Sequence, residues 1–116
     1  MVNLQASQLD MLFYALSDST RRQILALVGK KAHTVTELAK PFKISLAAIS
    51  KHIKILEESK LLVRKREGRI HSCTLDASAL KSAEECIHFY TQFWNRQLDL
   101  LAEQLEEPHA KRKKRN

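Results

Sequence analysis

The sequence predicts a mostly α-helical fold with one small β-hairpin, built as a single domain over residues 1–107. Three observations lead to this prediction. Apolar residues recur at helical spacing through most of the 116-residue chain. One short segment, residues 61–75, changes to a period of two residues. Only two glycines and two prolines are present, which argues against a fold of many strands and turns.

Two short helices are expected at the N-terminal end. The first covers residues 6–16, where apolar side chains at positions i, i+3, i+4 and i+7 form one helical stripe. This stripe consists of Leu9, Leu12, Phe13 and Leu16. The second helix begins after Ser17 or Asp18, either of which can cap it. Gly29 is placed to end that helix in a left-handed turn.

A short helix, a tight turn and a longer helix are expected next. Thr34 and Glu37 have the capping-box spacing, in which each side chain binds an otherwise unpaired amide of the first helical turn. Pro41 lacks a backbone donor, so this helix should be short or kinked near its end. Ser45 can cap the following helix, which extends over residues 45–57. Together these elements predict a helix-turn-helix.

A hairpin and a long helix complete the chain. The hairpin has its centre at Gly68 and its strands within residues 63–73, directly after the helix-turn-helix, which is the position of a wing. Asp76 can cap the last helix, over residues 77–106. Its apolar residues, spaced by three or four, are Leu80, Ala83, Ile87, Tyr90, Trp94, Leu98, Leu101 and Leu105. This stripe is longer than one small domain needs, so we expect it to pair with a second copy.

The helix at residues 45–57 has two different sides when its residues are placed at 100° intervals. The expected inner side is Leu46, Ile49, Ile53 and Leu56, and the outer side is Ala47, Ala48, Ser50, Lys51 and Lys54. Alanines allow close approach to a DNA groove, while the serine and lysines can bind phosphates or base edges. His52 lies between the two sides, and its role stays open between the core and a phosphate.

The charge distribution supports binding to a polyanion. Residues 19–75 carry thirteen Lys or Arg and four Glu, a charge of +9, whereas residues 76–107 have a charge of −5. The last nine residues, 108–116, form a basic tail of charge +5 that we expect to be disordered. The hairpin contributes Arg64, Lys65, Arg66, Arg69 and His71. The sequence therefore predicts double-stranded DNA as partner, with the helix in the major groove and the wing on the backbone or minor groove.

Four stretches resemble the ArsR-type (ArsR/SmtB) winged helix-turn-helix regulators, over nearly all of residues 9–106. They read ALSDSTRRQIL, TVTELAKPFKISLAAISKHIKILEESKLL, GRIHSCTLD and HFYTQFWNRQLDLL. The similarity is strongest to a metal-independent branch of the family. It implies a homodimer that pairs through its first and last helices, binds an inverted-repeat operator and usually represses transcription. We expect its own promoter to be among its targets.

The resemblance also assigns residues by position. On the recognition helix it implies DNA contacts from Ser45, Ala47, Ala48, Ser50, Lys51 and His52, and on the wing from Arg64, Arg66 and Arg69. We expect the dimer interface to include Leu9, Leu12, Phe13, Ile87, Tyr90, Trp94, Leu98 and Leu101.

The chain also departs from the family pattern at four positions. Lys43 and Lys60 replace glycines in two turns, where a positive φ would cost each lysine about 1 kcal/mol. Leu46 replaces a glutamine that reads bases, and Ala47 replaces a proline. Direct base readout should therefore be sparse, and groove shape should contribute more.

Other functions were weighed against this one. Residues 37–41 lack the cysteines of a metal-sensing relative, which leaves His71, Cys73, Cys86 and His88 as weak candidates for a metal- or thiol-responsive derepressor. A non-specific nucleoid-type protein that depends on the basic tail is a second alternative. The sequence contains no catalytic set, so no enzyme and no cofactor are predicted. It has neither a leader nor a membrane-spanning run, which predicts a cytoplasmic protein, and it identifies no inducer.

Overall fold

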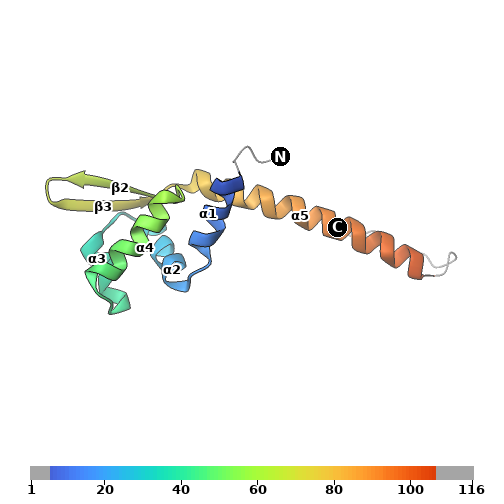
Figure 1. Ribbon diagram of the computed structural model, residues 1–116, viewed down its shortest axis with the longest axis horizontal. Helices are drawn as coiled ribbons and strands as arrows, with labels where there is room; N and C mark the ends of the chain where they lie inside the picture. The colour runs from blue at the N-terminus through green and yellow to red at the C-terminus, as the bar shows by residue number, and fades with distance from the viewer. Residues whose placement is uncertain (1–5, 107–116) are drawn as a thin grey trace.

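The computed structural model describes residues 6–106, as a helical body with a small sheet and one long protruding helix (Figure 1). In chain order the elements are α1 (Ala6–Leu16), α2 (Ser19–Lys30), β1 (His33–Thr34), α3 (Val35–Ala39), the 3-10 turn η1 (Lys40–Phe42), α4 (Leu46–Glu58), β2 (Leu62–Glu67), β3 (Ile70–Leu75) and α5 (Ala77–Leu105). The prediction of a mostly α-helical fold with a hairpin is confirmed. The expected basic tail lies outside the described residues.

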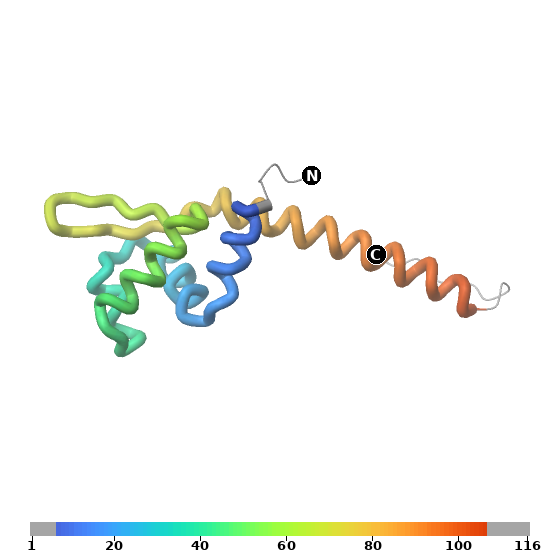
Figure 2. The backbone as a smooth tube through the Cα atoms, viewed as in Figure 1, coloured from blue at the N-terminus to red at the C-terminus, as the bar shows by residue number. Residues whose placement is uncertain are grey.

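The hairpin and α5 extend from opposite ends of the body formed by α1 to α4 (Figure 2). The molecule measures 71 × 30 × 21 Å, and its radius of gyration is 20.2 Å. A compact chain of this length has a radius of gyration of about 13 Å. The extended α5 accounts for this difference. No helix within residues 6–106 is both long enough and apolar enough to cross a membrane.

The sheet has three antiparallel strands in the order β1-β3-β2. Strands β2 and β3 form the expected hairpin, with Glu67 opposite Ile70 and a two-residue turn in which Gly68 has φ +63°. Strand β1 was not predicted, because two residues are too few to show an alternating pattern. It pairs His33 with Cys73 and so joins the start of α3 to the sheet.

Side-chain caps begin four of the helices, as the sequence predicts. The Asp18 carboxylate accepts a hydrogen bond from the Arg21 amide at 3.0 Å and so begins α2. Thr34 forms a reciprocal capping box in α3, and Ser45 Oγ accepts from the Ala48 amide at 3.1 Å in α4. Asp76 caps α5 in the same way. Each cap satisfies an amide that has no partner within its own helix.

The sequence made one wrong and two correct predictions about left-handed residues at the ends of helical segments. The prediction that Gly29 ends α2 in a left-handed turn is wrong: the helix continues to Lys30, and Lys31 is extended because the chain enters β1 directly. Lys43 and Lys60 do adopt positive φ, 53° and 69°, as expected from the glycines that they replace. Both lysines therefore occupy a conformation that favours glycine.

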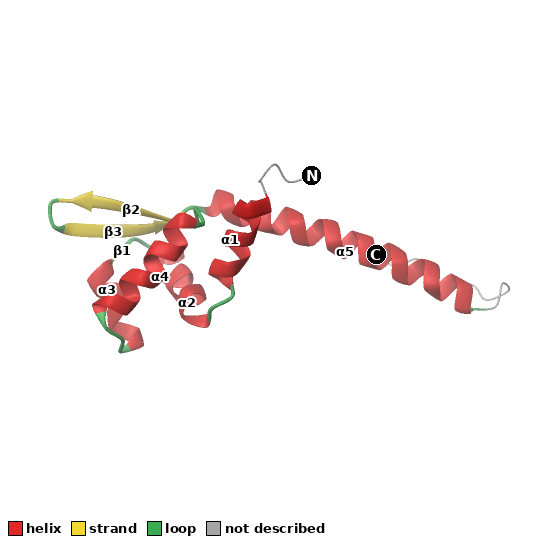
Figure 3. Cartoon of the chain, viewed as in Figure 1, coloured by secondary structure: helices red, strands yellow, loops and turns green. Residues whose placement is uncertain are grey.

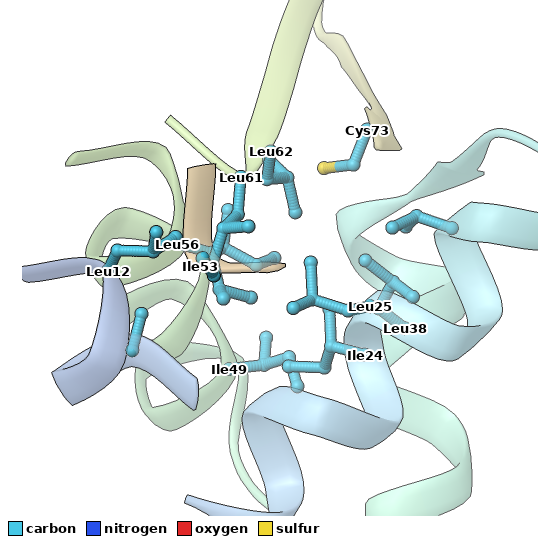
Figure 4. Close-up of a cluster of buried hydrophobic side chains, with 13 residues drawn as sticks. Leu12, Ile24, Leu25, Leu38, Ile49, Ile53, Leu56, Leu61, Leu62 and Cys73 are labelled. Carbon is cyan, nitrogen blue, oxygen red and sulfur yellow. The ribbon is translucent and has the colours of Figure 1, made fainter. Parts of the chain in front are cut away.

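The core lies where α1, α2, α3 and α4 meet the base of the sheet (Figure 4). Its fully buried side chains include Leu12, Ile24, Leu38, Ile49, Ile53, Leu56, Leu61 and Cys73. Two expectations are corrected here. Leu46 is 54% exposed, because the first turn of α4 projects beyond the elements that cover Ile49. Leu12 is 1% exposed within one protomer, so it packs in the core and is not available to a second copy.

Helix α5 is largely uncovered. Of its residues only Ala83 is buried, although Leu80 and Ala79 also pack against the core. Its exposed large apolar side chains are Ile87, Phe89, Tyr90, Phe93, Trp94, Leu98, Leu100, Leu101 and Leu105. Phe13 of α1 joins residues of α5 such as Tyr90 and Trp94 around an open groove of ≈ 450 Å³. A continuous apolar surface of this kind is characteristic of an interface.

Candidate nucleic-acid interface

The outer side of α4 is exposed along most of its length. Ser45, Ala47, Lys51 and Lys54 are exposed, and Ala48 and Ser50 are half-buried. The only acidic side chains of α4 are its last two, Glu57 and Glu58. Ser45 Oγ already accepts the capping hydrogen bond from the Ala48 amide, and its hydroxyl proton is still available to donate to a phosphate oxygen. The side that the sequence predicts for DNA is therefore accessible, small at its start and cationic further along.

The hairpin adds a second cationic surface. Lys65, Arg66 and Arg69 are exposed on or beside the turn, and the two strands project beyond the helices (Figure 3). The apolar side chains of Val63 and Ile70 are also exposed, 48% and 59%. The projecting hairpin can therefore contact a part of a bound DNA duplex that α4 does not reach.

A cleft of ≈ 350 Å³ lies between the start of α3, α4 and the hairpin. Ser50 contributes from α4, Thr36 from α3, and Arg69 and His71 from the hairpin. The cleft connects the outer side of α4 with the wing, including Arg69 beside its turn. Hydroxyl, imidazole and guanidinium groups are the types of donor that bind phosphate oxygens in protein–DNA interfaces.

Arg64 faces α4 as well as the solvent. Its Nη2 and Nε donate to the two carboxylate oxygens of Glu57 at 2.6 and 3.2 Å, and its Nη1 lies 3.4 Å from His71 Nδ1. The hydrogen bond from Arg64 to Glu57 raises the pKa of the guanidinium. This bidentate pair joins the end of the recognition helix to the wing. Sequence reasoning predicted Arg64 as a DNA contact and missed its partner Glu57.

His52 is turned toward α2. Its side chain is 23% exposed, with Nδ1 at 3.3 Å from Arg21 Nη1 and 4.0 Å from Asp18 Oδ2. The position that sequence reasoning left open is therefore engaged within the protomer. Nothing in the pattern of α4 alone identifies Arg21, which is 31 residues earlier in the chain.

Comparison with known proteins identifies this arrangement. A family model described as a helix-turn-helix domain matches residues 16–65. Transcriptional repressor SdpR of Bacillus subtilis is 32% identical over 84 residues, which cover 72% of this chain and 90% of that protein. HTH-type transcriptional regulator Rv2034 of Mycobacterium tuberculosis is 30% identical over 77% of this chain and 80% of that protein.

Solved structures agree with these relatives. The crystal structure of an ArsR family transcriptional regulator has a TM-score of 0.76 and 33% identity, and the match covers 82% of this chain and 97% of that one. This chain belongs to the ArsR family. An ArsR-like regulator from Rhodococcus sp. RHA1 also matches, with a TM-score of 0.74 and 27% identity over 88% of this chain and 95% of that one. This ArsR-family protein is a DNA-binding transcriptional regulator with a winged helix-turn-helix fold.

The cysteines and histidines within residues 6–106 of this ArsR-family chain form no metal site. Within residues 6–106, no three His, Cys, Asp or Glu side chains are grouped so that they could hold a metal ion. Cys73 is fully buried, and burial raises the pKa of its thiol, which disfavours the reactive thiolate. Cys86 is half-buried beside the groove between α1 and α5, and His88 is exposed. The four candidates therefore do not converge on one site.

Proposed function

We propose that this ArsR-family protein is a homodimeric repressor that binds an inverted-repeat operator, including one at its own gene. The observation that supports this most directly is the exposed cationic surface formed by α4 and the hairpin at one end of the protomer. In the proposed complex α4 enters the major groove. The hairpin lies on the backbone or in the minor groove. The relative SdpR is named a transcriptional repressor, which favours repression as the outcome.

The uncovered side of α5 supports the dimer. One copy of the chain is extended, with a radius of gyration of 20.2 Å. It leaves much apolar surface in water, including the exposed side chains of Trp94, Leu98 and Leu101. Pairing with the same surface of a second copy would bury it, and a two-fold arrangement closes the assembly. The net negative charge of residues 76–107 would repel DNA, so we expect α5 to contact the partner protomer and not DNA.

The dimer defines the operator that we expect. Two copies of α4 related by a two-fold axis read two half-sites about one helical turn apart, roughly 34–36 Å. DNase footprinting on the promoter of its own gene, followed by selection from a random DNA pool, tests this. Protection with two-fold symmetry supports the proposal. Protection without symmetry, or the absence of any selected sequence, contradicts it.

Three further arms of the same experiment address the alternatives. Deletion of residues 109–116 removes all five basic residues of the tail. A repressor keeps its operator preference without them, whereas a non-specific nucleoid-type protein loses most of its binding. Addition of zinc, and separately alkylation of Cys86, should leave operator affinity unchanged. Release of the operator by either treatment would favour the metal- or thiol-responsive derepressor.

A further inference from the structure

Arg21 is a charged residue in an unusual place, because only 5% of its surface is exposed. Its guanidinium lies at the C-terminal end of α1, where Nε donates to the Ala15 carbonyl at 2.8 Å and Nη2 to the Tyr14 carbonyl at 3.0 Å. It also lies 4.9 Å from the centre of the Tyr14 ring. The last carbonyls of a helix carry partial negative charge, so this end of α1 stabilises the buried cation.

The third arm of the same guanidinium reaches the recognition helix. Nη1 is 3.3 Å from Nδ1 of His52. An arginine side chain has donors and no acceptor, so Nδ1 must be the acceptor of this bond. The bond therefore requires the tautomer whose proton is on Nε2. Arg21 therefore ties the end of α1, the start of α2 and the middle of α4 together through one side chain.

We propose that the Arg21–His52 hydrogen bond positions the recognition helix for operator selection, and that His52 is a positioning residue rather than a phosphate contact. The inference rests on the proposed repressor function and deepens it. In the proposed dimer, α1 lies on the partner side of the protomer. Arg21 of α2 binds both the end of α1 and His52 of α4, so this one side chain sets the spacing of the two recognition helices. Operator DNA demands one spacing, whereas random DNA tolerates many.

His52→Ala and His52→Asn test the proposal as a pair. Alanine removes the acceptor, whereas the Oδ1 of asparagine can occupy the place of Nδ1 and accept from Arg21. We expect His52→Ala to lower operator affinity about tenfold, the typical effect of losing a hydrogen bond to a charged donor, and to leave affinity for random DNA unchanged. His52→Asn should restore most of the operator affinity. Both variants are measured at a temperature where unfolding experiments show them folded.

Asp18→Asn serves as the matched control. Asp18 Oδ2 lies 4.0 Å from His52 Nδ1, so an ion pair with a protonated imidazole is the competing explanation for any effect at His52. Asparagine caps helices as well as aspartate does, so Asp18→Asn removes the charge and keeps the start of α2. If the bond from Arg21 is what matters, operator affinity is unchanged in Asp18→Asn. A loss equal to that of His52→Ala would overturn the proposal.

Two further results would overturn it. If His52→Ala weakens operator and random DNA equally and lowers the salt dependence by about one ion, His52 is a phosphate contact. If His52→Asn binds no better than His52→Ala, the acceptor at Nδ1 has no role.

A readout without DNA separates this proposal from the proposed function. In the ¹⁵N NMR spectrum of the free protein at alkaline pH, His52 should show a bare Nδ1 and a protonated Nε2, and amide exchange in α4 should quicken in His52→Ala but not in His52→Asn. A proton on Nδ1, or equal exchange in the two variants, overturns the proposal. If the wild type selects no operator, the repressor function fails, and the NMR result still decides whether Arg21 and His52 hold α4.

Discussion

Replacing Lys60 by glycine should stabilise the protein. Lys60 has φ 69° and ends α4 in a Schellman motif, in which its amide donates to the Glu57 carbonyl and the Leu61 amide to the Leu56 carbonyl, both at 3.0 Å. A left-handed conformation costs an L-residue about 1–2 kcal/mol. Glycine removes this cost but loses about 0.4–1 kcal/mol through the entropy of its unfolded chain. The net gain in the free energy of unfolding is therefore about 0.5–1 kcal/mol.

Urea unfolding at one fixed protein concentration measures this gain, because the stability of a dimer depends on its concentration. Lys60→Ala is the matched control: it removes the same charge and methylene groups as Lys60→Gly but keeps a Cβ in the left-handed conformation. We expect Lys60→Ala to be close to the wild type and Lys60→Gly to be more stable than both. If the alanine and glycine variants unfold at the same urea concentration, backbone strain at this position does not limit stability.

Three other predictions concern the DNA surface, the dimer and the helix caps. Lys51→Ala and Arg66→Ala should each weaken binding to all DNA sequences and lower the slope of log affinity against log salt by about 1. Trp94→Ala should shift the protein toward monomer in sedimentation, because the exposed Trp94 belongs to the proposed interface. The free energy of unfolding should fall below about pH 4. A hydrogen bond from the Arg21 amide lowers the pKa of Asp18, and hydrogen bonds from Ser78 lower the pKa of Asp76. The stability that these two carboxylates contribute is lost as pH falls through their lowered pKa values.

Two of these predictions have a control variant within the chain, and each has an outcome that would contradict it. Lys81 is an exposed cation on α5, so Lys81→Ala should leave the salt slope unchanged. An unchanged slope in Lys51→Ala would instead remove that residue from the interface. A dimer that sediments normally with Trp94→Ala would contradict the proposed pairing surface. Asp76→Asn retains a cap without a titrating group, so its loss of stability in acid should be smaller than that of the wild type.

Local signals account for what the sequence predicted correctly. The caps at Asp18, Thr34, Ser45 and Asp76 depend on amides two or three residues away, so their spacing is visible in the chain. The hairpin and the long α5 follow from the period of their apolar residues. The positive φ of the lysines before and after α4 followed from the glycines that relatives carry there.

Tertiary packing accounts for what the sequence missed. A helical wheel places Leu46 and Ile49 on the same side of α4, yet Leu46 is exposed and Ile49 is buried. The wheel contains no information on how far along α4 the neighbouring elements pack. The stripe of α1 likewise did not reveal that its Leu12 packs inward within one protomer. Arg64 was assigned to DNA by the charge of its strand, whereas a carboxylate seven residues earlier holds it. These outcomes depend on neighbours that no local pattern specifies.

Two contacts hold the recognition helix from different directions, and the composition of α4 explains why this should matter for function. Arg21 binds it at His52, and the wing binds it through Glu57 and Arg64. If α4 enters the major groove as proposed, Ala47 and Ala48 offer DNA only methyl groups, which interact at van der Waals distance and cannot adjust their reach. A long side chain can compensate for a displaced helix by changing rotamer, but alanine cannot. Operator preference in this protein should therefore depend more on the position and orientation of α4 than on any one base contact.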